Sequence, residues 1–148
     1  VGVFVNAPME LVRTLLDDGT LALAQLHGQE DESYIRELKT YTDKLIIKAF
    51  SIKIAEDIEK ALQSSADYIL LDQGGGGTGK TFDWSLIPEI QRPFFLAGGI
   101  GASNLGQAIR EIHPYAVDLS SSVETEKRKD PMKIRQVVDI VREIKIIN

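Results

Sequence analysis

The chain contains the segment Tyr68-Ile69-Leu70-Leu71-Asp72-Gln73-Gly74-Gly75-Gly76-Gly77-Thr78-Gly79-Lys80-Thr81-Phe82-Asp83-Trp84, an apolar run that ends in a carboxylate and a glycine-rich loop. From Gly74 to Thr81 it matches G-x-x-x-x-G-K-[ST], the spacing of a phosphate-binding P-loop. Alternatively, it is a buried strand ending at Asp72, a glycine-rich loop at a binding site, and a short helix that begins at Phe82. The two interpretations predict different α/β folds, so the rest of the chain must decide between them.

On both sides of this segment, short apolar runs alternate with segments of helical spacing. The runs predict strands at residues 2–5, 21–26, 45–50, 68–71, 94–97 and 116–119. Pro8 suits the first turn of a helix that Gly19 ends. Pro114 ends a later helical segment, and Pro131 begins the last one. Strand–helix alternation predicts an α/β fold with a parallel sheet whose strands are buried on both faces. It fits an open doubly wound sheet or part of a (β/α)8 barrel, and length alone favours the open sheet because a complete barrel takes about 250 residues.

Composition narrows the class of protein. The 148 residues, 43% apolar and 26% charged, predict one domain over 1–148. A net charge of −5 argues against nucleic-acid and membrane partners, and we interpret the basic cluster 127–129 as a solvated loop. No apolar run approaches a membrane span and no signal peptide is recognisable, so we expect a cytoplasmic protein. The absence of cysteine and the presence of only two histidines predict no disulfide, no thiolate zinc site and no bound metal.

Polar residues follow the predicted strands, where the βα loops of α/β proteins build their sites. Asp72 is a candidate general acid, because partial desolvation can raise the pKa of a carboxyl group beside a cleft. A turn or capping role is the alternative. The pairs Gly98-Gly99 and Ser121-Ser122, with Ser120, offer backbone N–H groups after consecutive strands, which predicts a phosphate site.

Four more polar residues lie within or near the predicted strands. Gln25 and His27 alternate onto one face of their strand, where His27 is either an interior histidine or a substrate contact. Lys48 and Asp118 place charges in apolar strands, which is costly unless each is paired. Asp118 is therefore either part of a buried pair or an acceptor for a substrate hydroxyl.

The surroundings of the glycine-rich loop do not suit a P-loop. A P-loop needs a sturdy helix after its Lys-Thr pair, because the helix N-terminus helps to hold the phosphates. The segment that follows here is short and contains Pro88.

Specific blocks resemble the phosphoribosylanthranilate isomerase family of tryptophan biosynthesis, whose members are (β/α)8 barrels. The matching blocks, in family order, are VGVFVN at 1–6, QLHG at 25–28, IKA at 47–49, LLD at 70–72, GKTFDWS at 79–85, AGG at 97–99, AVDLSS at 116–121 and VE at 123–124. The resemblance implies an Amadori rearrangement of N-(5'-phosphoribosyl)anthranilate without metal or cofactor. It implies that Asp72 is the general acid, that Gly98, Gly99, Ser121 and Ser122 bind phosphate, and that His27 and Asp118 contact the substrate.

The chain also departs from that family pattern. The family's base is a cysteine in a Lys-x-Cys-Gly block of the first barrel strand, and an arginine after the second strand binds the substrate carboxylate. Neither block occurs here, so the resemblance covers barrel strands three to eight, and Ser122 stands where the family usually has glycine. We therefore expect an incomplete barrel, inactive by itself, which is completed by an N-terminal segment or by self-association through its exposed edges. A P-loop nucleotide-binding domain and a non-catalytic barrel scaffold are the alternatives.

Overall fold

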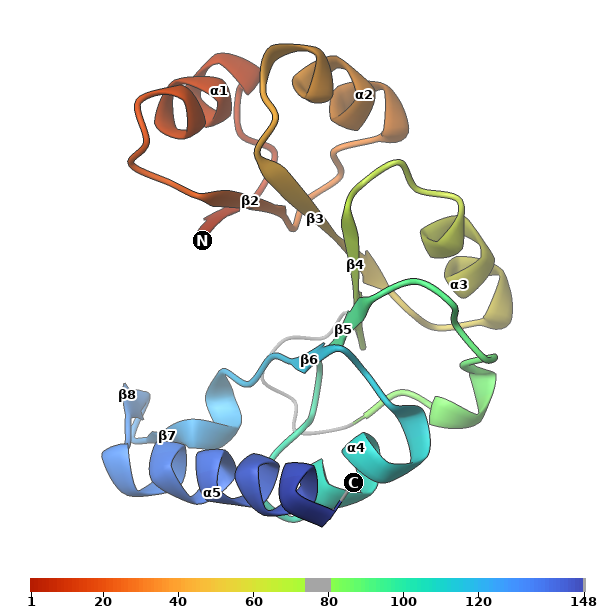
Figure 1. Ribbon diagram of the computed structural model, residues 1–148, viewed down its shortest axis with the longest axis vertical. Helices are drawn as coiled ribbons and strands as arrows, with labels where there is room; N and C mark the ends of the chain where they lie inside the picture. Colours follow the sequence, from red (N-terminus) through yellow and green to blue (C-terminus); the bar gives the residue numbers. More distant parts are fainter. Residues whose placement is uncertain (74–80, 148) are drawn as a thin grey trace.

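The computed structural model describes residues 1–73 and 81–147 and contains one six-stranded parallel sheet (Figure 1). The strands follow one another in chain order across the sheet. They are β1 (Gly2–Phe4), β2 (Leu23–Leu26), β3 (Leu45–Ser51), β4 (Tyr68–Asp72), β5 (Phe94–Leu96) and β6 (Ala116–Val117). This order without reversal is that of a barrel wall, whereas a doubly wound sheet reverses direction at a switch point. The open doubly wound sheet, which length alone favoured, is therefore wrong.

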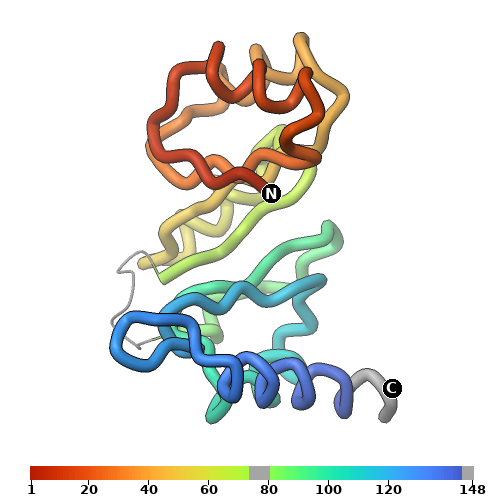
Figure 2. Tube along the Cα trace, turned by 90° about the vertical axis from the view of Figure 1, so that its left-hand side faces the viewer, coloured from red at the N-terminus to blue at the C-terminus, as the bar shows by residue number. Residues whose placement is uncertain are grey.

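The α-helices of the described residues connect or follow the strands and lie along the convex side of the curved sheet (Figure 1). They are α1 (Met9–Asp17), α2 (Glu32–Tyr41), α3 (Ala55–Leu62), α4 (Leu105–Ile112) and α5 (Pro131–Ile147). Local chemistry sets their ends: the Asp31 carboxylate accepts a hydrogen bond from Tyr34 N at the start of α2, and Gly19, at φ +77°, follows α1. Figure 2 shows that the chain advances steadily from β1 to α5, so its first and last elements lie at opposite ends.

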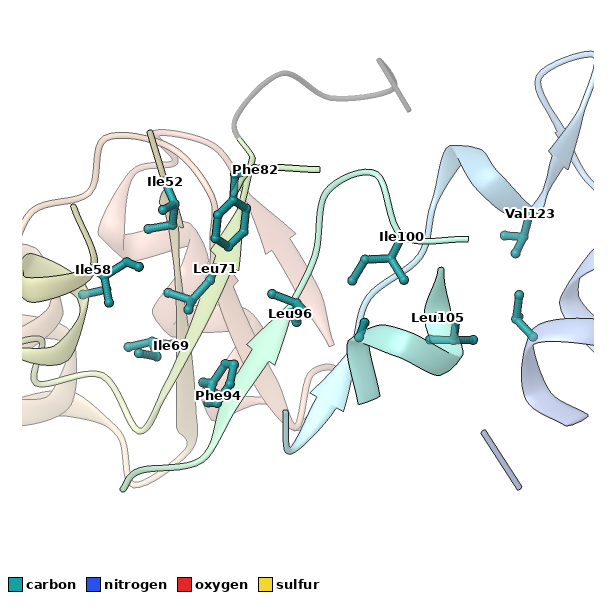
Figure 3. Close-up of a cluster of buried hydrophobic side chains, with 13 residues drawn as sticks. Ile52, Ile58, Ile69, Leu71, Phe82, Phe94, Leu96, Ile100, Leu105 and Val123 are labelled. Carbon is teal, nitrogen blue, oxygen red and sulfur yellow. The ribbon is translucent and has the colours of Figure 1, made fainter. Parts of the chain in front are cut away.

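The hydrophobic core lies mainly between the sheet and the helices. Leu71, Leu96 and Ile69 project from β4 and β5 into a cluster that includes side chains of α3 and α4 (Figure 3). A second cluster joins α1 and α2 to β1, β2 and β3. On the opposite, concave face, a smaller cluster contains Ile47, Ala49 and Leu70 from the central strands, together with Ala97, which directly follows β5.

Burial on both faces holds for the central strands but not for the edge of the sheet. Ile46, Ile47, Leu70 and Leu71 are buried, whereas Val3 in β1 is 61% exposed. The last strand is also shorter than predicted, because pairing ends at Val117. β1 and β6 each have one neighbour among the described strands, as expected for an open wall. In the described part of the chain, no helix is long and apolar enough to cross a membrane.

A two-stranded hairpin stands apart from the sheet. It consists of β7 (Glu124–Thr125) and β8 (Arg128–Lys129), joined by Glu126 and Lys127, both at positive φ. Positive φ at both central residues is typical of a tight type I′ turn. The hairpin directly follows the short 3-10 helix η2 (Ser121–Val123). Its charged side chains therefore lie next to residues 120–122, which we call the serine loop.

Candidate active site

A cavity of about 390 Å³ lies at the carboxyl ends of β2, β4, β5 and β6. Its lining includes all seven residues that the sequence predicts for the site, although they are spread over nearly a hundred positions: His27, Asp72, Gly98, Gly99, Asp118, Ser121 and Ser122. Ala97, Ile100, Ser120 and Glu124 complete the lining. The site combines titratable side chains with two loops that offer backbone N–H groups.

Asp72 and His27 form the titratable side of the cavity. Asp72 is the last residue of β4, where it pairs with Ser51, and its Oδ2 lies 3.4 Å from His27 Nε2. The buried Gln25 holds the other ring nitrogen, with its Nε2 3.0 Å from His27 Nδ1. The contact shows that Gln25, in β2, and His27, which directly follows β2, point to the same side of the sheet. The Nε2 atom of His27 faces Asp72, within hydrogen-bonding reach of its carboxylate.

The carboxylate changes the acid–base behaviour of the histidine. The hydrogen bond to Asp72 raises the pKa of His27 above its ordinary value, and the charges of Asp72 and Asp118 act in the same direction. Partial burial and the charge of Lys48 oppose this effect but do not cancel it. The folded state therefore favours the protonated ring.

This shift predicts a pH-dependent contribution of His27 to stability. A group whose pKa is higher in the folded state stabilises fully below its unfolded pKa of 6.5, and the contribution is lost as pH rises through the folded pKa. We expect His27→Gln to lower the free energy of unfolding more at acidic than at alkaline pH. Denaturant titrations at several pH values measure the difference. An NMR titration of His27 should give a midpoint above 6.5 that falls in Asp72→Asn; a midpoint at or below 6.5 would contradict the assignment.

The loop after β5, residues 97–101, lies against the carboxylate of Asp72 at Gly98. Gly98 adopts φ +80°, and a Cβ at this position would lie 2.5 Å from Asp72 Oδ1 and 2.6 Å from the backbone nitrogen of Gln73. Glycine is therefore required both for its backbone conformation and for its lack of a side chain. The Asn104 side chain holds the same loop, accepting from Gly101 N at 2.9 Å and donating to Gly99 O at 3.1 Å.

Gly98→Ala is expected to displace Asp72 and to lower both stability and activity. The matched control is Gly19→Ala, because Gly19 has φ +77° with nothing within 4 Å of a built Cβ. The control should cost about 1–2 kcal/mol for the left-handed backbone alone, and Gly98→Ala should cost more because of the contact. Chemical denaturation of both variants gives the difference. Equal losses in the two variants would show that the close approach to Asp72 has no energetic consequence.

The serine loop also lines the cavity. Ser121 and Ser122 belong to η2, and Ser122 Cβ lies 3.1 Å from a Cβ built on Gly101, so the two loops touch. Lys129 Nζ donates to Ser120 O at 3.0 Å and lies 2.7 Å from Glu124 Oε1. The solvated loop predicted at 127–129 is thus a hairpin, and one of its three cations contacts the loop that lines the cavity.

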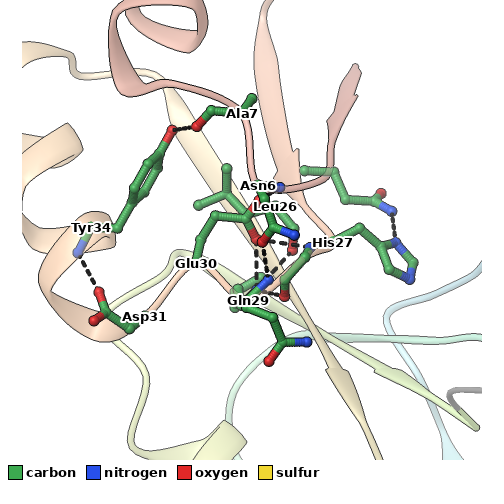
Figure 4. A network of polar contacts seen from close by, with 11 residues as sticks. Asn6, Ala7, Leu26, His27, Gln29, Glu30, Asp31 and Tyr34 are labelled. Carbon is green, nitrogen blue, oxygen red and sulfur yellow. Dashed lines mark hydrogen bonds and ion pairs between the residues drawn. The ribbon is translucent and has the colours of Figure 1, made fainter.

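Lys48 has a partner that the sequence did not reveal. Its Nζ lies 3.0 Å from Glu30 Oε2, and the two side chains are 6% and 1% exposed. Glu30 also accepts from the backbone nitrogens of Asn6 at 2.6 Å and Gly28 at 2.8 Å, so it joins the loops after β1 and β2 (Figure 4). Asp118, by contrast, lies beyond the end of β6 and is exposed. The buried pair considered for Asp118 is therefore wrong, and its contact with the cavity remains.

The P-loop match falls almost entirely on Gly74 to Lys80, outside the described residues. After it, Trp84–Leu86 form only a single 3-10 turn, which begins with Asp83 accepting from Ser85 N. This confirms that no sturdy helix follows the motif, whose place in a P-loop would be at the N-terminus of such a helix.

A curved parallel sheet, helices along its convex side and a polar cavity at the carboxyl ends of its strands define an α/β protein of the (β/α)-barrel class. A family model described as N-(5'phosphoribosyl)anthranilate (PRA) isomerase matches residues 1–140. The chain belongs to the N-(5'-phosphoribosyl)anthranilate isomerase family.

Individual relatives agree with this assignment. The N-(5'-phosphoribosyl)anthranilate isomerase of Endomicrobium trichonymphae is 45% identical over 148 residues, which cover 97% of this chain and 72% of the relative. The crystal structure of phosphoribosyl anthranilate isomerase from Thermotoga maritima superposes with a TM-score of 0.82 at 36% identity, covering 96% of this chain and 72% of that one. Another solved isomerase, in complex with reduced 1-(o-carboxyphenylamino)-1-deoxyribulose 5-phosphate, has a TM-score of 0.79 at 34% identity, covering 96% and 70%. The predicted resemblance is confirmed, and neither a P-loop domain nor a non-catalytic scaffold is supported.

Proposed function

We propose that this chain forms the acid and phosphate-binding part of a phosphoribosylanthranilate isomerase, with the site in the cavity that Asp72 borders. The observation that carries the proposal is the joining of a carboxylate, a histidine and two loops of glycine and serine in one cavity. Opening a ribose ring needs a proton on the ring oxygen, and a phosphorylated sugar needs donors for its phosphate. The lining of the cavity offers both.

Asp72 is the proposed general acid. Protonation of the ring oxygen lets the C1'–O bond break while the anthranilate nitrogen supplies its lone pair, which yields a Schiff base. Loss of the C2' proton then gives the enamine of the product. His27, at 3.4 Å from Asp72, is placed to return a proton to the spent carboxylate. The C2' proton needs a base, and the family resemblance assigns that role to a cysteine that these 148 residues do not contain.

Gly98, Gly99, Ser121 and Ser122 are the proposed phosphate-binding residues. Gly98 and Gly99 adopt positive φ, and such turns can direct successive backbone N–H groups toward an anion. Asp118 is the proposed acceptor for a ribose hydroxyl, and its position in the cavity lining supports this role. The relative crystallised with a reduced carboxyphenylamino-deoxyribulose phosphate supports a ligand of this class.

The test is turnover of phosphoribosylanthranilate, followed through the loss of its fluorescence, by the product of the complete reading frame. We expect consumption without added metal or cofactor, and inhibition by the reduced carboxyphenylamino-deoxyribulose phosphate. No consumption by a folded, complete product would contradict the proposal.

Two further properties belong to this proposal. A biosynthetic role like that of the relatives supports a cytoplasmic location. Self-association through the ends of the sheet, at β1 and β6, is also proposed, and one solved relative is described as a dimeric isomerase from which monomers were generated. Sedimentation over a range of concentrations would show whether this chain associates.

A further inference from the structure

We propose that Lys129 is the positioning residue of the phosphate subsite: it neutralises Glu124 and braces the serine loop, so that a phosphate dianion can bind beside a carboxylate. This inference rests on the proposed function, because it assumes that the cavity takes a phosphorylated ligand. It assigns a role to a side chain outside the cavity lining.

The carboxylates that line the cavity would repel a phosphate dianion unless a cation compensates them. The lining contains three carboxylates, Asp72, Asp118 and Glu124, and its described residues include no lysine or arginine. Backbone N–H groups can hold a phosphate, but an uncompensated carboxylate at the same loop repels a dianion. Glu124 directly follows η2 (Ser121–Val123), and its carboxylate lies 2.7 Å from Lys129 Nζ.

Lys129 has two acceptors on Ser120 and a third on Glu124, in the strand that follows η2. Its ammonium lies 2.7 Å from Glu124 Oε1, 3.0 Å from Ser120 O and 3.2 Å from Ser120 Oγ. The same cation therefore cancels the charge of Glu124 and holds the residue that precedes Ser121 and Ser122. A neutral side chain at position 129 would leave the carboxylate charge at the rim and the Ser120 carbonyl without this donor.

The hairpin fixes the position of this ammonium. Glu124 and Lys129 are directly paired in the antiparallel ladder of β7 and β8, and Asp130 N donates to Val123 O at 2.8 Å. Lys133 Nζ contacts Glu124 O at 2.6 Å, which anchors the same strand to α5. Side chains at directly paired positions lie close together, so the register sets this contact.

The experiment measures ligand affinity, which separates this role from catalysis. Isothermal titration of the complete protein uses inorganic phosphate and reduced 1-(o-carboxyphenylamino)-1-deoxyribulose 5-phosphate as probes. We expect Lys129→Met to weaken both by about tenfold, with the loss shrinking as salt is added, because charge interactions at an exposed rim are screened. Lys127→Met is the matched control: it removes an exposed lysine from the turn of the same hairpin and should change affinity by less than about twofold.

A second substitution, at Glu124, tests whether Lys129 acts by neutralising Glu124 or only by holding Ser120. If Lys129 compensates Glu124, the double variant Lys129→Met/Glu124→Gln should bind both probes within about threefold of the wild-type protein, a non-additive result expected for coupled residues. A double variant as weak as Lys129→Met would overturn the neutralising role. Because the Lys129 and Glu124 side chains are 53% and 25% exposed, we expect all variants to fold, which circular dichroism verifies.

The outcomes also distinguish this inference from the proposed function. A wild-type protein that binds neither probe overturns the phosphate site and this inference with it. A wild-type protein that binds both, together with an equally tight Lys129→Met variant, overturns only the inference.

Discussion

In the product of the complete reading frame, Asp72→Asn is expected to lower kcat by about 10²–10⁴-fold, the range that general acid catalysis contributes. The amide keeps the size of the carboxyl group but cannot transfer a proton to the ribose ring oxygen. Gly98 lies close to one carboxylate oxygen of Asp72 and His27 to the other, and an amide of the same size can occupy the same space. The loss should therefore appear in turnover, while affinity for the reduced product analogue changes by less than about tenfold, because binding and proton transfer rest on different groups.

Asp118→Asn is the matched control for this variant. Asp118 lines the same cavity, but it is exposed at the rim and is proposed only to accept a hydrogen bond. We expect this change to raise KM and to leave kcat within about tenfold of the wild-type value. Stopped assays over a range of substrate concentrations separate the two parameters. If Asp72→Asn retained more than a tenth of wild-type kcat, Asp72 would not be the acid.

Lys48→Met is expected to lower the free energy of unfolding by about 3–5 kcal/mol, the usual cost of leaving a buried charge without its partner. The affected charge is that of Glu30, whose side chain is 1% exposed. Its remaining donors, the backbone nitrogens of Asn6 and Gly28, hold the loops after β1 and β2. Because Gly28 follows His27, we also expect the loss to disturb the histidine side of the cavity. Urea denaturation with NMR of the His27 ring measures both effects.

Two comparisons make this prediction specific. Lys60→Met removes a lysine that is 73% exposed and 3.9 Å from Asp57, and it should cost less than about 1 kcal/mol. The double variant Lys48→Met/Glu30→Gln removes both buried charges and should be more stable than Lys48→Met alone. A Lys48→Met variant no less stable than Lys60→Met would show that the buried pair does not hold these loops.

The pH dependence of the pair follows from Glu30. Burial by itself raises the pKa of Glu30, but hydrogen bonds from its own backbone N–H, from Lys48 and from Asn6 outweigh it, and the pKa lies below its ordinary value. A group with a depressed folded-state pKa contributes stability above its unfolded pKa of 4.5 and loses it as pH falls through the folded value. The pair is therefore intact at neutral pH and weakens in acid.

Much of the site could be predicted because parallel strands bring their carboxyl ends to one edge. Asp72, Gly98 and Ser121 each follow a separate apolar run, and strand–helix alternation is enough to place such residues together. The predicted end of the last strand was wrong because apolar character continues to Leu119, whereas pairing stops at Val117. As a result, Asp118 is exposed and unlike the buried charge that its apolar neighbours suggested.

By itself, then, the sequence determined the α/β class, the family and the seven residues of the candidate site, because periodicity and short motifs are local properties of a chain. Only the tertiary structure decided which charges meet. Lys48 pairs with Glu30, His27 meets Asp72 across 45 positions, and Lys129 reaches Glu124 and Ser120 through a hairpin. These contacts depend on strand register, sheet curvature and turn geometry, which arise from packing over the whole chain and leave no pattern in any one segment.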